Sequence, residues 1–424
     1  MKKTDVLVIG GGPGGMAAAI AANEKGCSVL IIEREKRLGG ILKQCIHDGF
    51  GLIRFAEKLS GPEYAERYVD QIISEGIPYL TQAFVTKIEE EHGEYHVYLV
   101  TKNGIEECLA KSLVLATGCR ERTAKQVMIQ GTRPAGVYTA GTAQYLTNIL
   151  GEMPTKKCVI LGSGDIGLIM ARRLTLEGAS VCGVYEVKST PSGLDRNLVQ
   201  CLDDYQIPLY LSHTVTKVFG EDRLTGVEVA MVDDSMKVME GTRQQIECDA
   251  LILSVGLIPE NEIAQSLGIQ MDPMTKGPVC DQQFMTSKNG IFSCGNALHV
   301  NDLVDYVSES GMLAGSSAAD YVKQGIHVDA NVEIWVNAEI GTIVPQKIAL
   351  GMGKSDAMQE LMIYMRSRRD LKKAKLKFFM NEKLCYEKKL SNVKPPEMIK
   401  IVLPFSKEQL QPEMEMKIEL LEEK

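Results

Sequence analysis

The residues of this sequence best suited to chemistry form a glycine-rich segment near its beginning. They are Gly10, Gly12, Pro13, Gly14 and Gly15. In this spacing the first glycine permits a tight turn, the second lets the backbone approach a pyrophosphate, and the third permits close packing of a helix on a strand. The N-terminus of that helix offers free N–H groups to phosphates. The pattern predicts a dinucleotide site; the alternative is a glycine-rich turn with a purely structural role.

The elements that must position these glycines follow in the required order. An apolar strand at 6–9 precedes them, an alanine-rich helix at 16–25 follows, and a second strand at 28–32 ends on Glu33. A carboxylate at Glu33, 18 residues past Gly15, can accept hydrogen bonds from an adenosine ribose. We expect the neighbouring Arg34 to belong to the same site.

The same order of elements returns about 150 residues later. A strand at 158–161 leads into a second glycine segment, and a helix at 168–177 and a strand at 180–185 follow it. The expected nucleotide-binding residues of this second unit are Gly162, Gly164, Asp165, Ile166 and Gly167. One chain therefore contains two nucleotide-binding units.

The acid at the end of the second unit bears on the choice of nucleotide. Glu186 lies 19 residues past Gly167. A carboxylate there favours the ribose diol of NAD and repels the 2′-phosphate of NADP. Lys188 is close enough to weaken this discrimination, so the sequence favours NAD(H) without excluding NADP(H).

Length and composition restrict the remaining possibilities. The chain has 424 residues, of which 45% are hydrophobic and 24% charged, and this predicts several globular domains. Its net charge of −8 argues against nucleic acid as the main partner. The 11 cysteines show no CxxC pair and no spacing typical of a metal or iron–sulfur site, so we expect reduced thiols in a cytoplasmic protein without a bound metal. No stretch of roughly 20 apolar residues predicts a transmembrane segment.

The pattern along the chain predicts an α/β fold with two Rossmann-like domains, the second inserted in the first, and a small C-terminal β-sandwich. Helices are expected from Gly61 and over 304–324. In the last segment the strands expected are 333–336, 360–365, 375–380, 384–389 and 399–403. The expected domains are residues 1–121 and 258–328 for the first nucleotide, 122–257 for the second, and 329–424 for the β-rich domain.

Three further segments make the sequence resemble the two-dinucleotide-binding-domain flavoproteins, which include the pyridine nucleotide–disulfide oxidoreductases. These segments are 115–118 (Leu-Ala-Thr-Gly), 254–259 and 291–296. The resemblance covers about residues 4–328 and implies FAD on the first unit and NAD(H) on the second. It adds these residues to the expected cofactor sites: Thr117, Gly118, Gly256, Gly295, Asn296 and Val307.

The sequence departs from this family's pattern in three places. Asn296 stands where the family normally has an acid that accepts bonds from the ribityl hydroxyls. No second cysteine lies near Cys45, so the redox pair of the disulfide reductases is missing. Ile169 replaces a glutamate common after the third glycine of the NAD motif. Disulfide reduction by this chain alone is therefore disfavoured.

Other segments resemble a subgroup that works inside multicomponent dehydrogenases. They are 39–51, 118–122, 133–141 and 298–305. Relatives include the NAD/FAD subunits accompanying anaerobic-type glycerol-3-phosphate dehydrogenases and, more distantly, subunits of opine, proline and sarcosine oxidoreductases and of cyanide synthase. The resemblance implies that the partner is a second flavoprotein dehydrogenase subunit, and it leaves room for a small iron–sulfur or Cys-rich protein. Two alternatives stay open: a free-standing NADH oxidase or reductase, and a nucleotide-binding regulatory or scaffold subunit.

The resemblance places Gly39, Gly40 and Ile41 beside the isoalloxazine. Cys45 and His47 follow them, and we hypothesise a redox or charge-transfer thiol at Cys45 and a proton donor at His47. The alternative is a packed thiol and a surface histidine.

Two later segments have both a functional and a structural interpretation. His299 and Asp302 precede the helix at 304–324, whose N-terminus is expected to point at the flavin pyrimidine ring; Asp302 is equally well suited to capping that helix. Residues 366–377 contain seven basic side chains and one acid. They predict either a solvated face or a dock for an acidic partner.

Overall fold

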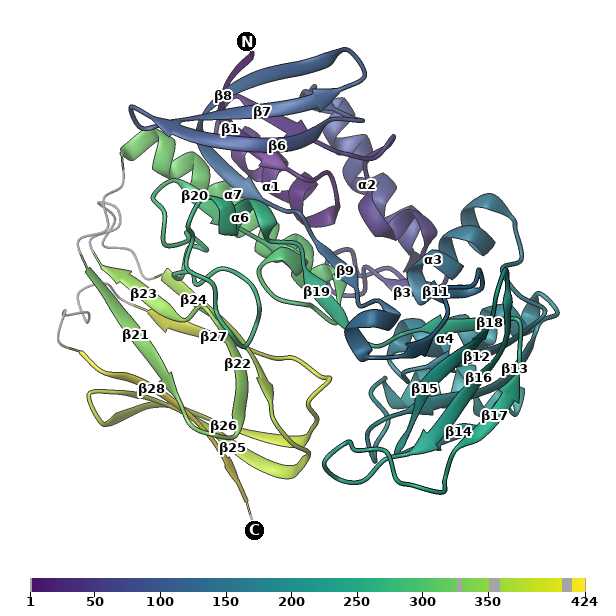
Figure 1. The fold of residues 1–424 in the computed structure, drawn as a ribbon. Helices are drawn as coiled ribbons and strands as arrows, with labels where there is room; N and C mark the ends of the chain where they lie inside the picture. The colour runs from purple at the N-terminus through teal and green to yellow at the C-terminus, as the bar shows by residue number, and fades with distance from the viewer. Residues whose placement is uncertain (1, 326–329, 351–358, 406–413, 424) are drawn as a thin grey trace. The chain divides into compact units, whose positions relative to one another are not determined.

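The structure, a computed structural model, describes residues 2–325, 330–350, 359–405 and 414–423 (Figure 1). It divides into two compact units. The first combines residues 1–119 with 259–424, and the second contains residues 120–258. The paired strands β9 (Cys119–Glu121) and β19 (Leu257–Pro259) carry the chain out of the first unit and back into it. The second Rossmann-like unit is therefore inserted in the first.

The first unit contains a seven-stranded sheet in the order β5-β2-β1-β8-β7-β6, with β20 also paired to β8. Its parallel strands are β1 (Lys2–Ile9), β2 (Val29–Ile32), β5 (Tyr79–Leu80), β8 (Gly104–Leu115) and β20 (Ile291–Ser293). The hairpin of β6 (Phe84–Glu91) and β7 (Glu94–Thr101) continues the sheet antiparallel. Residues 6–9 and 29–32 are continuously apolar because both faces of these strands are buried: alternate side chains belong to two different hydrophobic clusters.

Two helices of this unit, α1 (Pro13–Glu24) and α7 (Val304–Gln324), lie side by side (Figure 1). The approach is so close that a Cβ on Gly311 would lie 2.1 Å from the carbonyl oxygen of Gly14. This contact explains why α1 is alanine-rich and buried on nearly all sides rather than amphipathic. A third helix, α2 (Gly61–Ser74), begins with a capping box between Ser60 and Glu63.

The second unit contains a parallel five-stranded sheet in the order β11-β18-β12-β13-β14. Its strands are β11 (Val137–Thr139), β12 (Lys157–Leu161), β13 (Ser180–Glu186), β14 (Leu209–Leu211) and β18 (Ala250–Leu253). Its helices are α3 (Ala140–Tyr145), α4 (Asp165–Leu176) and α5 (Asp195–Cys201). A second sheet, in the order given, contains β10 (Gln130–Gly131), β15 (His213–Gly220), β16 (Leu224–Met231) and β17 (Gln244–Glu247).

The C-terminal residues form two sheets that share one core, which confirms the predicted sandwich. The first has the order β23 (Lys347–Leu350), β21 (Ala330–Val336), β28 (Met416–Glu422), β25 (Leu371–Met380) and β26 (Lys383–Val393). The second has the order β22 (Ile340–Val344), β24 (Gln359–Ser367) and β27 (Ile399–Phe405). Apolar side chains such as Ile334, Phe378, Ile363 and Leu403 fill the space between them.

Three strands of this sandwich, β22, β23 and β28, were not predicted. In β28 the signal was present, because Met416, Ile418 and Leu420 alternate with exposed or half-buried residues. The other two are short and are separated by only two residues. Smaller elements of the first unit are β3 (Asp48–Phe50), β4 (Leu59–Ser60) and α6 (Glu262–Ser266). Within the described ranges, no helix is both long and apolar enough to cross a membrane.

Candidate functional site

The first glycine segment is closed by the carboxylate at the end of β2. Glu33 is only 5% exposed, and its Oε2 accepts a hydrogen bond from the Gly11 N–H at 2.7 Å. Its Oε1 accepts one from the Glu35 N–H, also at 2.7 Å. Glu33 thus ties the glycine turn to the loop that follows β2, at the carboxyl edge of the sheet where α/β proteins bind nucleotides.

Backbone geometry at Gly10 and Gly12 fits a dinucleotide. Gly10 has a φ of +110°, and a Cβ there would lie 2.2 Å from the Ala116 carbonyl oxygen, so the turn demands glycine. Around Gly12 the nearest atom to an added Cβ would be the Gly40 Cα, 4.0 Å away. The bare backbone of Gly12 therefore faces free space at the N-terminus of α1, and Pro13 occupies the first helical position. These residues fit the pyrophosphate of FAD.

The second glycine segment repeats this arrangement. Gly162 has a φ of +98°, and a Cβ there would lie 2.0 Å from the Ser254 carbonyl oxygen. Glu186, 4% exposed, accepts hydrogen bonds from the Ser163 N–H at 3.0 Å and from the Ser163 hydroxyl at 2.5 Å. Its other oxygen accepts the Lys188 N–H at 3.1 Å. The residues of the second unit fit a second dinucleotide for the same reasons.

Two predicted residues of the second unit face the protein rather than free space. Asp165 Oδ1 accepts hydrogen bonds from the Leu194 N–H at 2.9 Å and from Asn197 Nδ2 at 2.6 Å. The Ile166 side chain packs against the unit's core. Their backbone N–H groups, at the start of α4, are the parts available to a phosphate, while Gly164 and Gly167 form the turn.

The first turns of α7 lie against the first glycine segment. Val307 Cγ1 would be 3.2 Å from a Cβ on Gly14 and 3.0 Å from one on Gly295. The Gly295 N–H donates to Ser310 Oγ at 2.8 Å. Thus the structure brings Val307 and Gly295, both predicted, to the glycine segment.

Three polar side chains of α7 tie its beginning to other segments of the first unit. Asp305 accepts the Arg54 N–H at 3.0 Å, and Ser308 Oγ lies 2.8 Å from the Tyr64 hydroxyl of α2. Glu309 accepts a hydrogen bond from the Tyr364 hydroxyl. None of Asp305, Ser308 and Glu309 was predicted as a site residue, because only the fold shows which segments meet at the start of α7.

The late motif and the Thr117-Gly118 segment lie at the same edge. Asn296 Oδ1 accepts the Asn301 N–H at 3.0 Å, and its Nδ2 donates to Cys119 Sγ at 3.5 Å. The Thr117 hydroxyl donates to the carbonyl oxygen of Glu260 at 2.6 Å. Where the family has an acid, this chain therefore holds an amide that takes part in bonds to its own neighbours.

Two other predicted cofactor residues have different surroundings. Arg34 forms an ion pair with Glu260, with 2.8 Å between Nη1 and Oε2. Glu260 was not predicted, and no local pattern marks it. Gly256 belongs to the second unit, where its carbonyl oxygen accepts the Arg122 N–H at 3.1 Å.

The segment after Gly39-Gly40 forms a 3₁₀ turn, residues Gly40–Gln44, in which Ile41 is 59% exposed. The Cys45 thiol donates to the Ile41 carbonyl oxygen at 3.5 Å. Burial raises the pKa of the Cys45 thiol to about 12, so it is protonated at neutral pH. This pKa opposes the hypothesis of a charge-transfer thiolate. His47 is half-buried, with its ring centroid 5.0 Å from that of Phe50.

One expectation for the later segments is wrong. Asp302 does not cap α7, whose N-cap is Leu303; instead the Asp302 carboxylate pairs with Arg366 and accepts the Met398 N–H at 2.6 Å. Part of the basic run at 366–377 is neutralised within the chain, while Arg368, Lys372 and Lys373 are exposed, so both a solvated face and a dock for an acidic partner stay predictions. Arg369 pairs with Glu339 and Glu422, and other members pair within the chain through Asp302, Glu423 and Glu387.

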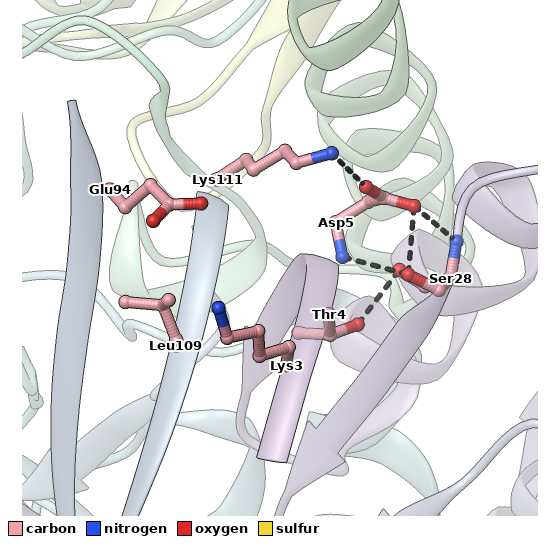
Figure 2. Close-up of a pocket in the computed structure, with 7 residues that line it drawn as sticks. All are labelled: Lys3, Thr4, Asp5, Ser28, Glu94, Leu109 and Lys111. Atoms are coloured by element: carbon pink, nitrogen blue, oxygen red, sulfur yellow. Dashed lines mark hydrogen bonds and ion pairs between the residues drawn. The ribbon is translucent and has the colours of Figure 1, made fainter. Parts of the chain in front are cut away.

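One pocket of the first unit lies away from the glycine segments. Figure 2 shows this pocket of about 200 Å³, in which Lys111 reaches Asp5 at 2.8 Å and Asp5 bonds to Ser28. Asp5 lies before the apolar half of β1, whereas the glycines follow its end. The pocket is thus at the amino edge of the parallel strands, opposite the edge where α/β folds bind nucleotides.

Comparison with known proteins agrees with this geometry. A model of the family described as "Pyridine nucleotide-disulphide oxidoreductase" matches residues 4–342. The chain is 26% identical to the HcnB subunit of hydrogen cyanide synthase from Pseudomonas protegens, over 62% of this chain and 59% of that protein. It is 25% identical to a subunit of opine oxidase from Agrobacterium tumefaciens, over 74% and 65%. The chain thus spans less than two thirds of the length of either relative.

Solved structures show the same fold. Thioredoxin reductase of T. acidophilum superimposes with a TM-score of 0.62 at 22% identity, covering 75% of this chain and 98% of that one. The family match spans most of the chain, and both glycine segments with their acids lie within it. The chain belongs to the pyridine nucleotide-disulphide oxidoreductase family, whose members are oxidoreductases that bind FAD and NAD(P)H.

Proposed function

We propose that this protein is an electron-transfer subunit that moves hydride between NAD(H) and FAD and exchanges electrons with a partner dehydrogenase. The observation that carries the proposal is the pair of closed glycine turns, each clamped by a buried acid, in a chain that lacks a cysteine pair for disulfide chemistry. Among the described residues no two cysteines form a disulfide. In such a protein electrons can pass between two bound nucleotides, and we infer that a separate molecule then accepts them from the flavin.

FAD is assigned to the first unit. Glu33 would hold the adenosine ribose, and Gly12 with the N-terminus of α1 would hold the pyrophosphate. The isoalloxazine end would lie among the remaining predicted residues, which are Gly39, Gly40, Ile41, Thr117, Gly118, Gly295, Asn296 and Val307. The close packing of Val307 against Gly14 and Gly295 supports this assignment, because it brings the start of α7 to the glycine turn.

NAD(H) is assigned to the second unit, with Gly164 and the start of α4 on its pyrophosphate and Glu186 on its ribose. The burial of Glu186 supports NAD over NADP, since a carboxylate fixed by three hydrogen bonds cannot swing away from a 2′-phosphate. Only the backbone N–H of Lys188 is part of this clamp.

The chemistry that the two bound nucleotides would supply is hydride transfer between the nicotinamide C4 and the flavin N5. The protein's own residues orient the two rings, exclude water and set the local field. The positive end of α7 favours negative charge next to its first turn. Cys45 is a neutral thiol that packs in the site and donates a weak hydrogen bond. The proposed reaction requires no covalent bond between a residue and a nucleotide.

The partner we favour is a flavoprotein dehydrogenase that oxidises a small hydroxy acid or phosphorylated polyol, such as glycerol 3-phosphate. A small iron–sulfur or Cys-rich protein can complete the assembly. The resemblance of residues 39–51 and 298–305 to subunits of such enzymes supports this proposal. Two kinds of relative found by comparison are themselves named as subunits, of hydrogen cyanide synthase and of opine oxidase.

The reoxidation of the reduced flavin tests the proposal. The chain alone is reduced anaerobically with NADH, and its flavin absorbance is followed in stopped flow after mixing with oxygen, a quinone, a small disulfide or ferricyanide. We expect slow reoxidation by the first three and fast reoxidation by ferricyanide, which mimics an external electron partner. Multiple turnovers at about 10 s⁻¹ or faster, a typical enzyme rate, with oxygen, quinone or disulfide would instead establish a free-standing oxidase or reductase. A bound flavin that NADH leaves oxidised would favour the regulatory or scaffold role.

A further inference from the structure

The C-terminal sandwich contacts the beginning of α7 through buried and half-buried polar side chains. Tyr364 of β24 is 1% exposed, and its hydroxyl donates to Glu309 Oε2 at 2.7 Å. Lys400 of β27 reaches the same carboxylate oxygen at 2.6 Å. Glu309 is the sixth residue of α7, two residues after Val307, which packs on Gly14. Both strands of the sandwich therefore hold the helix within two turns of its N-terminus.

Arg366, also on β24, holds the loop that enters the helix. Its Nη2 donates to the Val300 carbonyl oxygen at 3.1 Å and to the Asp302 carboxylate. Its Nη1 donates to the carbonyl oxygens of Pro395 and Pro396. One guanidinium thus joins loop 300–302 to the turn before β27, a geometry that its planar, multiply donating group allows and a lysine does not.

His299 lies beneath this clamp. It is 6% exposed, and its ring centroid is 5.3 Å from that of Tyr364. Burial, with the charge of Arg366 adding to it, lowers the pKa of His299 to about 3. The imidazole is therefore neutral, and its Nε2 has no hydrogen-bond partner among the residues that the structure describes. A protonatable group next to α7 is thereby kept uncharged.

We propose that the C-terminal sandwich is a working part of the flavin site, in which Tyr364, Arg366 and Lys400 are positioning residues that fix the start of α7. The inference rests on the proposed binding of FAD to the first unit. The field of a helix N-terminus falls off within its first turn. A small displacement of this end of α7 therefore changes how well negative charge on the reduced flavin is stabilised.

The family match ends at residue 342, before β24 and β27, so the sandwich residues of this clamp, Tyr364, Arg366 and Lys400, lie outside the matched range. Two charged side chains of the sandwich, Arg366 and Lys400, form ion pairs with Asp302 and Glu309 at this contact. Arg366 and Lys400 are only 21% and 20% exposed, whereas Arg369, in the same basic run, is 50% exposed and pairs with Glu339 and Glu422. Arg369 therefore offers a matched control that touches neither α7 nor loop 300–302.

The test measures the midpoint potential of the bound flavin by spectroelectrochemistry in the wild-type protein and in Arg366→Met, Tyr364→Phe and Arg369→Met. We expect Arg366→Met to shift the oxidised–reduced equilibrium about tenfold toward the oxidised flavin, which is a fall of roughly 30 mV for a two-electron couple. Tyr364→Phe removes one hydroxyl and no charge, and we expect a smaller shift of the same sign. Arg369→Met should match the wild type, and the Kd for NADH should be unchanged in all three.

Arg366→Lys separates positioning from charge, because lysine keeps the positive charge but lacks the several donors of the planar guanidinium. A shift in midpoint potential comparable to that of Arg366→Met supports positioning. Thermal unfolding identifies any variant that does not fold, and Tyr364→Phe then decides. Flavin-loaded variants with the wild-type potential, or an equal shift in Arg369→Met, would overturn this inference alone. A wild-type chain that takes up no FAD would overturn the proposed function and this inference with it.

Discussion

The two glycine units share one arrangement but attach their neighbouring loops in different ways. In the first, Glu33 binds the Gly11 N–H and the loop after β2 packs Leu38 against Gly11, where an added Cβ would lie 2.4 Å from Leu38 Cδ2. In the second, the equivalent position is Ser163, whose hydroxyl bonds to Glu186 and accepts the Ser192 N–H at 2.9 Å. At this one position, therefore, packing holds the first loop and side-chain hydrogen bonds hold the second.

This difference follows from where each loop leads. The first loop continues into Gly39, whose N–H donates to the Gly11 carbonyl oxygen at 2.8 Å, and then into the segment expected at the isoalloxazine. The second loop continues into α5, and Asp165 holds the start of that helix by accepting hydrogen bonds from Leu194 and Asn197. Each unit therefore keeps the same turn and acid, while the position after its first glycine is fitted to its own loop.

The largest effects should come from closing the open face of each turn with a methyl group. Gly12 and Gly164 have φ values of −76° and −65°, and no atom lies within 3.4 Å of an added Cβ, so alanine leaves both folds unstrained. Gly12→Ala should weaken FAD binding by about a hundredfold or more, because two charge-assisted hydrogen bonds of about 1.5–3 kcal/mol each are lost. Gly164→Ala should leave the flavin content unchanged and raise the Kd for NADH by a similar factor.

Flavin-to-protein ratios and NADH titrations of both variants measure this prediction, and each variant is the control for the other. Loss of flavin in Gly164→Ala, or retention of full flavin in Gly12→Ala, would show that the two nucleotides are assigned to the wrong units.

The next largest effect concerns the acid of the second unit. Glu186→Gln removes the charge and keeps the side chain's size, so we expect the ratio of NADPH to NADH affinity to rise about tenfold, or roughly 1.4 kcal/mol. Flavin reduction rates at varied NADPH and NADH concentrations measure it. Glu33→Gln is the matched variant: it should weaken flavin binding and leave the coenzyme preference as in the wild type. An unchanged preference in Glu186→Gln would place the 2′-position away from this carboxylate.

A smaller effect is expected from the side-chain hydrogen bonds of Ser163 and Asp165, because glycine and proline occupy the matching positions of the first unit. Asp165→Ala frees Leu194 and Asn197, and Ser163→Ala removes two hydroxyl bonds, each worth about 0.5–1.5 kcal/mol. Either change should raise the KM for NADH severalfold and leave the flavin content and its spectrum unchanged. A loss of flavin in these variants would contradict the independence of the two units.

The smallest effect should come from Cys45, the thiol nearest the glycine pair of the first unit. Because its pKa is raised to about 12, the thiol is protonated below pH 10, and alkylation by iodoacetamide should be slow at pH 7 and accelerate steadily toward pH 11. Cys45→Ser should not change the flavin absorbance above 500 nm. Rapid alkylation at pH 7, or a long-wavelength band lost in Cys45→Ser, would restore the charge-transfer hypothesis.

The sequence predicted the parts of this protein that are local and missed those that depend on the fold. Each glycine turn and its acid lie within about 25 residues, and α7 was predicted with its observed bounds because its pattern is continuous. Asp302 was misread as a helix cap because its partners, Arg366 and Met398, lie more than 60 residues away. The acids that pair with the basic run, among them Glu422 and Glu423, were not predicted for the same reason: they come from a distant part of the sequence.

An anaerobic NADH titration of the purified chain, with NADPH in parallel, tests most directly whether the two units exchange electrons. We expect a yellow protein whose flavin absorbance near 450 nm is bleached by one equivalent of NADH per flavin, and by NADPH only at higher concentration. A protein that carries flavin but keeps its absorbance with excess NADH, or one that binds no flavin, would show that hydride does not pass between the two units.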